Sequence, residues 1–377
     1  MTKRNFGRLI LAILKNNIVT VIAAVAAAVT MFIVPPDGEY LGYFDFKTLT
    51  CLFCVLAVVC ALRNIRFFYT LAGKIVRVFK TARLSVLGLV YVTFIGSMLI
   101  ANDMALLTFL PLGYYVLHTT KKEKYMAFTF IMQNIAANLG GMLTPFGNPQ
   151  NLYLYSKFNI PDGEFLLIML PLFLLSVGLI TLCCIIFVKA EPLEVEKVNY
   201  NTPVWRVIVY LVLFCLSVII VFRVIPYWIG LIVIPIALLV LDRRALLNVD
   251  YGLLLTFVFF FIFSGNLGRI EAVRGFFESL LSYNVTVVSS LLCQFISNVP
   301  SAILLSQFTD NYRELLMGVN IGGVGTLISS LASLITFREY TMHNKGKTLS
   351  YVLKFSAFNF AFLIILMGAA LLLTWLF

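Results

Sequence analysis

The chain carries few charged residues for its length. Asp, Glu, Lys and Arg make up 12% of its 377 residues, against roughly 25% in an average soluble domain. Hydrophobic residues make up 61%, and the mean hydropathy is +0.98. A soluble chain of this length could not bury so much apolar surface, so the composition predicts an all-α membrane protein with several spans.

Motifs for catalysis and nucleotide binding are also missing. The sequence contains no G-x-x-x-x-G-K-[ST] phosphate loop, no H-E-x-x-H helix, no Ser-His-Asp arrangement and no heme motif, so we expect no enzyme activity and no cofactor. The two histidines, His118 and His343, are predicted to lie in loops. Cys51 and Cys54 have the spacing of a metal or redox pair, but no His or second pair lies near them. We interpret them as packing within an apolar helix.

Acidic residues are scarcer than basic ones, which gives a net charge of +11. The basic residues lie in short segments between apolar runs, which argues against nucleic-acid binding and for membrane topology. The first apolar run, 18–34, is long enough to span a bilayer, and no cleavage-site pattern follows it. We therefore expect no cleavable signal peptide.

The strongest local signal is a polar break inside an apolar run, from Asn138 to Asn151. It contains several Gly, Pro and Asn residues, and a helix broken in this way is tolerated in a membrane only where protein or water covers the backbone. A similar break follows 182 residues later, and two broken helices in corresponding halves of a chain indicate a transporter binding site. Four residues of each break align: Asn138, Gly140, Gly141 and Thr144 with Asn320, Gly322, Gly323 and Thr326.

The apolar runs predict two halves of the same plan. Each half has two spans, an interfacial helix, a re-entrant hairpin, a broken helix and a further span, with a linking span at 204–222 that inverts the second half. We expect about nine spans in all. The predicted repeat boundaries are 1–188 for the first repeat, with a hairpin at 84–118 and a broken helix at 125–155; 189–203 for a cytoplasmic linker; and 204–377 for the linking span and second repeat, with a hairpin at 285–308 and a broken helix at 313–337.

The distribution of basic residues supports this topology. With the N-terminus inside and both hairpins re-entrant, the inside segments hold 22 Lys and Arg and the outside segments hold six. A first hairpin that crossed the membrane fully would invert everything after it and remove this bias. We therefore expect a multi-pass protein of the plasma (inner) membrane with its N-terminus in the cytoplasm and its C-terminus outside. The segment 63–83, with basic and apolar residues at helical spacing, is predicted to lie on the membrane surface or to form a basic cytoplasmic loop.

Asp103 is the one acid within an apolar segment that cannot readily reach a loop or an interface. A carboxylate inside the bilayer is costly and marks an ion or proton path by default. The alternative is that Asp103 only caps a helix beginning at Met104.

The breaks also supply helix N-termini and small polar groups, which suit anions and hard cations without a fixed positive charge. Asn148-Pro149 has the pattern of an N-cap followed by the first helical residue. Because carbonyl, amide and carboxylate oxygens are ligands for hard cations, we expect a Na⁺ site at Asn102, Asp103 and Gly147. The full set of expected ion-coupling residues is Asn102, Asp103, Gly147, Asn298 and Ser329, and that of substrate-binding residues is Asn102, Thr144, Asn148, Asn151, Ser297, Asn298, Thr326 and Ser330.

Two hairpins with Asn at each tip, each followed by a broken helix, resemble the ion transporter superfamily over roughly residues 40–377. This group includes divalent-anion/sodium symporters, citrate transporters, arsenite permeases and D-type sodium/proton antiporters. The symporters carry Ser-Asn-Thr at the tips, whereas this chain has Ala101-Asn102-Asp103 and Ser297-Asn298-Val299. Gly147-Asn148-Pro149 is similar to the Gly-Thr-Pro of the symporters. The Asn102-Asp103 pair is closer to the arsenite permeases and antiporters.

The sequence and this resemblance together predict a secondary active transporter that works by alternating access. We expect it to move a small anion, a di- or tricarboxylate such as citrate, coupled to Na⁺ or H⁺. Two alternatives remain open at this point, a sodium/proton antiporter and a permease for arsenite or another inorganic oxyanion. The expected partners are the small anionic substrate and the lipid bilayer, with no nucleic acid, and the resemblance implies a homodimer.

Overall fold

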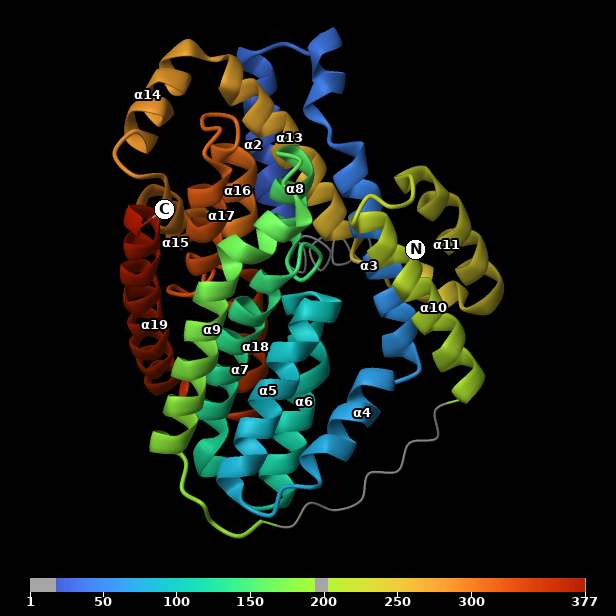
Figure 1. Cartoon of the computed structure of the whole chain (residues 1–377), viewed down its shortest axis with the longest axis vertical. Helices are drawn as coiled ribbons and strands as arrows, with labels where there is room; N and C mark the ends of the chain where they lie inside the picture. Colours follow the sequence, from blue (N-terminus) through green and yellow to red (C-terminus); the bar gives the residue numbers. More distant parts are fainter. Residues whose placement is uncertain (1–17, 194–202, 377) are drawn as a thin grey trace, which may run out of the picture.

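The computed structural model describes residues 18–193 and 203–376, and it is built from helices (Figure 1). The N-terminal residues 1–17 and most of the predicted linker, 194–202, lie outside the described residues. The helices of the first half are α2 (Ile18–Ile33), η1 (Gly38–Tyr43), α3 (Phe46–Asn64), α4 (Phe67–Val76), α5 (Ala82–Ile100), α6 (Asn102–Thr119), η2 (Glu123–Tyr125), α7 (Met126–Gly140), η3 (Gly141–Leu143), α8 (Pro149–Lys157) and α9 (Asp162–Phe187). Those of the second half are α10 (Val204–Val221), α11 (Tyr227–Leu241), α12 (Arg243–Leu247), α13 (Tyr251–Arg269), α14 (Glu271–Leu281), α15 (Val285–Ile296), α16 (Asn298–Leu305), α17 (Tyr312–Ile321), α18 (Leu331–His343) and α19 (Thr348–Leu376).

Short polar side chains and prolines set many of the helix starts. Asp45 accepts a hydrogen bond from the backbone N–H of Thr48 at the start of α3, and Asp250 does the same for Leu253 in α13. Proline is the N-cap residue of α9, α10 and α11, where its missing N–H costs nothing because the first turn has no intrahelical acceptor. These caps satisfy backbone groups that would otherwise be left bare at the helix ends.

The all-α membrane fold predicted from composition is confirmed. Within residues 18–193 and 203–376, six helices are long and apolar enough to cross a membrane, and a seventh span is added if α14 and α15 form one bent span. The predicted number of nine spans and the re-entrant nature of the hairpins stay predictions. The sequence predicts a span at 251–264, and this range is too short, because α13 continues to Arg269 and the interfacial helix that follows, α14, starts only at Glu271.

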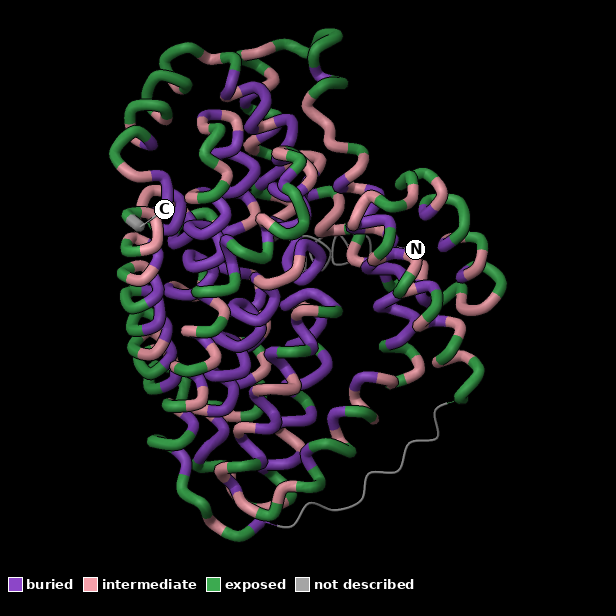
Figure 2. Tube along the Cα trace, viewed as in Figure 1, coloured by how far each residue is buried: buried purple, intermediate pink, exposed green. Residues whose placement is uncertain are grey.

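The inner and outer helices differ in how far their residues are buried. The middle of α7 is buried almost throughout, whereas α9, α10, α11 and α19 show alternating exposed faces (Figure 2). Those exposed faces are apolar, with residues such as Leu167, Trp228 and Ile364 more than half exposed. Apolar outward faces around a core that contains buried Asn, Gln, Ser and Thr are what a bilayer requires, since lipid cannot hydrate polar groups.

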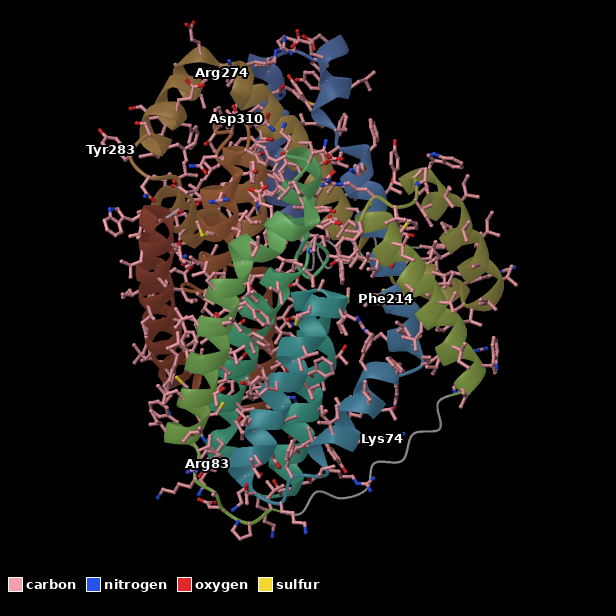
Figure 3. All side chains as sticks on the ribbon, in the orientation of Figure 1. Lys74, Arg83, Phe214, Arg274, Tyr283 and Asp310 are labelled. Carbon is pink, nitrogen blue, oxygen red and sulfur yellow. The ribbon has the colours of Figure 1, made fainter. Side chains whose placement is uncertain are left out.

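The connecting segments gather at two ends of the molecule. Lys74 and Arg83 lie at one end, and Arg274, Tyr283 and Asp310 lie toward the other (Figure 3). At the first end the connection after α9 pairs with the start of α5, through hydrogen bonds from Ala82 N to Glu191 O and from Leu193 N to Lys80 O. Helices α5 and α7 therefore start at this end of the molecule, and helices α6 and α9 finish there.

Candidate functional site

Each of the two helical hairpins turns on a single residue with the same unusual backbone. Ala101, between α5 and α6, has φ 66° and ψ 150°, and Ser297, between α15 and α16, has φ 74° and ψ 160°. This region is ordinarily open only to glycine. In each hairpin the next residue is Asn, whose Oδ1 accepts a 2.9 Å hydrogen bond from the backbone N–H that follows it. The two tips are therefore built in the same way.

The broken helices dock against the hairpins through equivalent contacts. Thr144 Oγ1 donates to the carbonyl of Met98 at 2.7 Å, and Thr326 Oγ1 donates to the carbonyl of Gln294 at 3.0 Å. The glycines at the helix ends, Gly140 and Gly322, pack closely against α5 and α15. Because the same bond recurs in both halves, Thr144 and Thr326 hold the breaks in position through their hydroxyl groups.

Asparagine side chains connect the two breaks across the centre of the protein. Asn320 Nδ2 donates to Asn151 Oδ1 at 2.6 Å, and Asn148 Nδ2 donates to Asn320 Oδ1 at 3.3 Å. Asn102 Nδ2 donates to Asn138 Oδ1 at 3.3 Å, which joins the first hairpin tip to α7. All five side chains are at most 3% exposed. The network brings together residues of both halves that the sequence had only aligned.

The two halves differ in how the hairpin tip meets its break. In the second half the tip donates two hydrogen bonds to the carbonyl of Ser329. The donors are the backbone N–H of Asn298, at 2.9 Å, and the hydroxyl of Ser297, at 3.3 Å. No corresponding bond joins Asn102 N to Gly147 among the described residues. The carbonyl of Ser329 is thus already paired within the protein.

A cavity of about 590 Å³ lies where the hairpin tips meet α2 and α13. Among the residues predicted to bind ion or substrate, Asn102, Asp103, Ser297 and Asn298 line it. The others lie off its wall, all of them buried except the half-buried Thr144 and Thr326. They are Thr144, Gly147, Asn148, Asn151, Thr326, Ser329 and Ser330.

Asp103 does not cap a helix. Helix α6 begins one residue earlier, at Asn102, and the N–H of Asp103 is itself bonded to the Asn102 side chain. Its Oδ1 atom is buried without a hydrogen-bond partner. The capping alternative for this residue is therefore wrong, and the carboxylate remains available at the cavity.

Two further residues at the cavity were missed in the predicted site set, Gln150 and Asp250. Gln150 is 1% exposed, and its Oε1 atom has no hydrogen-bond partner. The Oδ1 atom of Asn148, two residues earlier, also has no hydrogen-bond partner. Asp250 caps α13 and lines the same cavity as Asp103. Its position just before an apolar run gave only the signal of a helix start, so sequence alone could not place it beside Asp103.

The chemistry of the cavity suits a hard cation more than a transition metal. Asp103 and Asp250 supply carboxylates, Gln150 supplies an amide oxygen, and no Lys, Arg or His lines the cavity among the described residues. Among the described residues no group of three or more His, Cys, Asp or Glu could hold a metal ion. Unpartnered oxygens without nearby cationic side chains are the donors that Na⁺ or a proton would use.

Comparison with known proteins agrees with this architecture. Residues 9–312 match the model of a family described as citrate transporter. The chain is 32% identical over 302 residues to an uncharacterized transporter of Methanocaldococcus jannaschii, covering 80% of this chain and 82% of that protein. It is 31% identical over 307 residues to the inner membrane protein YbiR of Escherichia coli, covering 78% of this chain and 80% of that protein.

A solved structure shares the fold. The YdaH transporter of Alcanivorax borkumensis, whose topology is described as unusual, superposes with a TM-score of 0.56 over 90% of this chain and 88% of that chain, at 14% sequence identity. At this identity the likeness concerns the fold alone. The family match and the two relatives are independent of it and cover most of the sequence. The chain therefore belongs to the citrate transporter family and is a multi-pass membrane transporter.

Proposed function

We propose that this protein is a secondary active transporter that moves a small anion, a di- or tricarboxylate such as citrate, together with Na⁺ or H⁺. The observation that carries the proposal is the cavity at which two matching hairpin tips meet beside the Asp103 carboxylate. Membership of the family supports a transporter of anions. The choice of substrate and of coupling ion belongs to the proposal.

The coupling cation would bind at the first hairpin tip. Asp103 at the tip and Gln150 in α8 both line the cavity, and their Oδ1 and Oε1 atoms are acceptors without a hydrogen-bond partner. Asn102, also at the tip, bonds Asn138 of α7. Gly147 adds a backbone carbonyl in the adjoining break. A cation there would satisfy oxygens that the protein leaves bare, which offsets the cost of burying them.

The substrate would bind at the cavity side of both tips. Ser297, Asn298 and Asn102 present hydroxyl and amide donors there, at the N-termini of α16 and α6. Helix N-termini favour carboxylates without a fixed charge. In the part of the chain that the structure describes, the cavity wall holds acids and no basic side chain. A carboxylate substrate would therefore need the bound cation to balance its charge, and this requirement would be the physical basis for coupling.

Transport would proceed by alternating access, with each hairpin and its broken helix moving as a unit. The end that carries Lys74 and Arg83 (Figure 3) would lie in the cytoplasm of a plasma membrane, because the topology predicted from the sequence assigns 22 Lys and Arg to the inside and six to the outside. The N-terminus would then be cytoplasmic and the C-terminus outside. A homodimer is part of the proposal through the family resemblance.

Uptake into proteoliposomes tests the proposal directly. Purified protein would be reconstituted, and accumulation of radiolabelled citrate and of other di- and tricarboxylates would be measured under an inward Na⁺ gradient, an inward proton gradient, or neither. We expect gradient-driven accumulation of at least one carboxylate. If no carboxylate accumulates under either gradient, the proposal is wrong.

A sodium/proton antiporter is the second candidate. It is favoured by one observation, that the described residues lining the cavity include two acids, Asp103 and Asp250, and no basic residue. A pH-sensitive dye inside the same vesicles separates the two functions. An antiporter alkalinises the lumen when Na⁺ is added outside without any carboxylate, because Na⁺ enters as H⁺ leaves, whereas the proposed symporter leaves the luminal pH unchanged in the absence of its substrate.

A further inference from the structure

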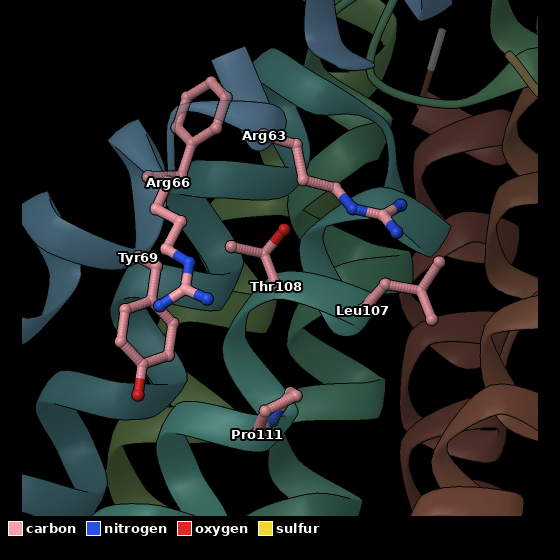
Figure 4. Close-up of a pocket in the computed structure, with 7 residues that line it drawn as sticks. Arg63, Arg66, Tyr69, Leu107, Thr108 and Pro111 are labelled. Atoms are coloured by element: carbon pink, nitrogen blue, oxygen red, sulfur yellow. The ribbon is translucent and has the colours of Figure 1, made fainter. Parts of the chain in front are cut away.

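A second pocket lies outside the proposed transport cavity, between the corner that joins α3 to α4 and the middle of α6. Its volume is about 300 Å³. The lining residues are Arg63, Arg66, Phe68, Tyr69, Leu107, Thr108 and Pro111. Figure 4 shows Thr108 of α6 between the side chains of Arg63 and Arg66. The pocket thus has basic residues on one side and the second helix of the first hairpin on the other.

The charges on this pocket are of one sign. Two guanidinium groups line it, and none of its residues is acidic. Arg63 Nη1 lies 3.5 Å from the sulfur of Met104, a weak acceptor that does not neutralise a cation. The planar donor fork of arginine matches the oxygens of phosphate and carboxylate. Two such forks at one small pocket are arranged for an anion.

The backbone adds to the positive electrostatic potential of this pocket. Helix α4 begins at the pocket, with Arg66 as its N-cap residue at φ 56° and with no side chain capping its first turn. The N–H groups of that turn carry the positive end of the helix dipole. An anion held by Arg63 and Arg66 would therefore also meet the start of α4, near Phe68 and Tyr69.

The surface of α4 indicates the source of the anion. Leu71 and Ile75 are 47% and 41% exposed, and Lys74 lies on the same helix. Exposed apolar residues interleaved with basic ones place a helix at the surface of a bilayer, among lipid headgroups. We propose that this pocket binds the phosphate of an anionic phospholipid headgroup, so that the lipid ties α4 to the first hairpin.

Lipid binding by the purified full-length protein tests this proposal without measuring transport. Native mass spectrometry would follow the binding of dioctanoyl phosphatidylglycerol and of dioctanoyl phosphatidylcholine, with inorganic phosphate as a competitor. We expect phosphatidylglycerol to bind at least about tenfold more tightly than phosphatidylcholine, because both carry the phosphate but only phosphatidylcholine adds a choline cation, which the two guanidinium groups repel. Inorganic phosphate that binds while the lipid does not would identify a soluble anion as the occupant and overturn the lipid assignment.

The variants Arg63→Gln and Arg66→Gln assign the binding to the pocket. Each is expected to weaken phosphatidylglycerol binding about tenfold. Lys74→Gln is the matched control, since Lys74 is a basic residue of α4 that does not line the pocket. An equal loss of phosphatidylglycerol affinity in all three variants would show that binding depends only on general surface charge, and it would overturn the assignment to this pocket. If the glutamine variants do not fold, Arg66→Lys replaces them, and unchanged binding in that variant would refute recognition by the guanidinium fork.

Discussion

At the scale of single residues, function in this protein depends on groups that are expensive to bury. Asp103 places a carboxylate oxygen without a partner at the cavity between the hairpin tips. Gln150, which also lines that cavity, and Asn148, two residues before it, leave amide oxygens without partners. A stably folded protein rarely leaves such groups unsatisfied. We therefore interpret them as ligands waiting for a cation, and this interpretation can be tested one residue at a time.

Asp103→Asn keeps the size of the side chain and removes its charge. We expect cation-driven carboxylate uptake to fall roughly ten- to hundredfold, because a ligand that bonds a charged partner contributes about that much. Uptake would be measured in proteoliposomes that hold equal amounts of protein. The control is Asp45→Asn, since Asp45 caps α3 outside the cavity and Asn caps a helix as well as Asp. Wild-type coupled uptake in the Asp103 variant would contradict the assignment.

Ala101 tests the backbone of the first hairpin tip. Its φ of 66° with ψ of 150° costs a residue with a Cβ roughly 1–3 kcal/mol, whereas glycine tolerates it. After the greater chain entropy of glycine is subtracted, Ala101→Gly is expected to raise the free energy of unfolding by about 1 kcal/mol.

Thermal unfolding of the detergent-solubilised protein measures this change. The matched control is Ala105→Gly, one turn further along α6, which we expect to destabilise by about 1 kcal/mol because glycine is unfavourable inside a helix. If both variants lower the melting temperature equally, the tip is not strained.

At the scale of helices, the protein uses close contact between each hairpin and its broken helix. A Cβ added at Gly140 would lie 2.2 Å from the carbonyl oxygen of Phe94, and one at Gly322 would lie 2.7 Å from Cys293 Cβ. These distances are shorter than any packed Cβ contact allows. The aligned pair Gly140 and Gly322 is thus explained by packing against α5 and α15.

Gly140→Ala and Gly322→Ala should each destabilise the protein by about 1–3 kcal/mol, the usual cost of overpacking. The measurement is again thermal unfolding. Gly178→Ala in α9 is the control, since nothing lies within 4 Å of its added Cβ and alanine favours a helix. A Gly140 variant as stable as the Gly178 variant would show that α7 and α5 can separate without cost.

At the scale of the whole molecule, one acidic residue holds several segments together at the basic end. Glu191 accepts hydrogen bonds from Lys122 at 2.6 Å, Lys124 at 2.5 Å and Tyr125 at 3.1 Å. These partners, Lys122 first, lower the pKa of Glu191 to about 2. Glu191 therefore connects the segment after α9 to the loop that begins α7.

The low pKa predicts how this contact depends on pH. A carboxyl group whose pKa is lower in the folded state stabilises the protein fully above its unfolded pKa of 4.5 and loses that effect as pH falls toward about 2. We expect Glu191→Gln to melt at a lower temperature than wild type at pH 7, and the difference to narrow as pH falls below 4.5.

Glu123→Gln is the control for this experiment, because Glu123 makes a single, more exposed pair with His118 at the same end. Its effect at pH 7 should be smaller. A difference between wild type and Glu191→Gln that stays constant from pH 7 to pH 3 would exclude the ionised carboxylate as its cause.

The sequence by itself determined the membrane class, the helix boundaries near prolines and caps, and the pairing of the two breaks, because these follow from composition and local backbone chemistry. The start of α8 at Pro149, after the N-cap Asn148, is a local effect of this kind. The alignment of Asn138 with Asn320 also needed no structure.

Only the tertiary structure decided which polar groups face the cavity. Thr144, Thr326 and Asn151 had the residue types expected of ligands, but their donors bond nearby backbone carbonyls. Asp250 gave only a helix-start signal and yet shares the cavity with Asp103. The physical reason is that a helix cap or a hydrogen bond within a break is set by neighbours in sequence, whereas the wall of a cavity is assembled from helices that meet only when both halves are folded.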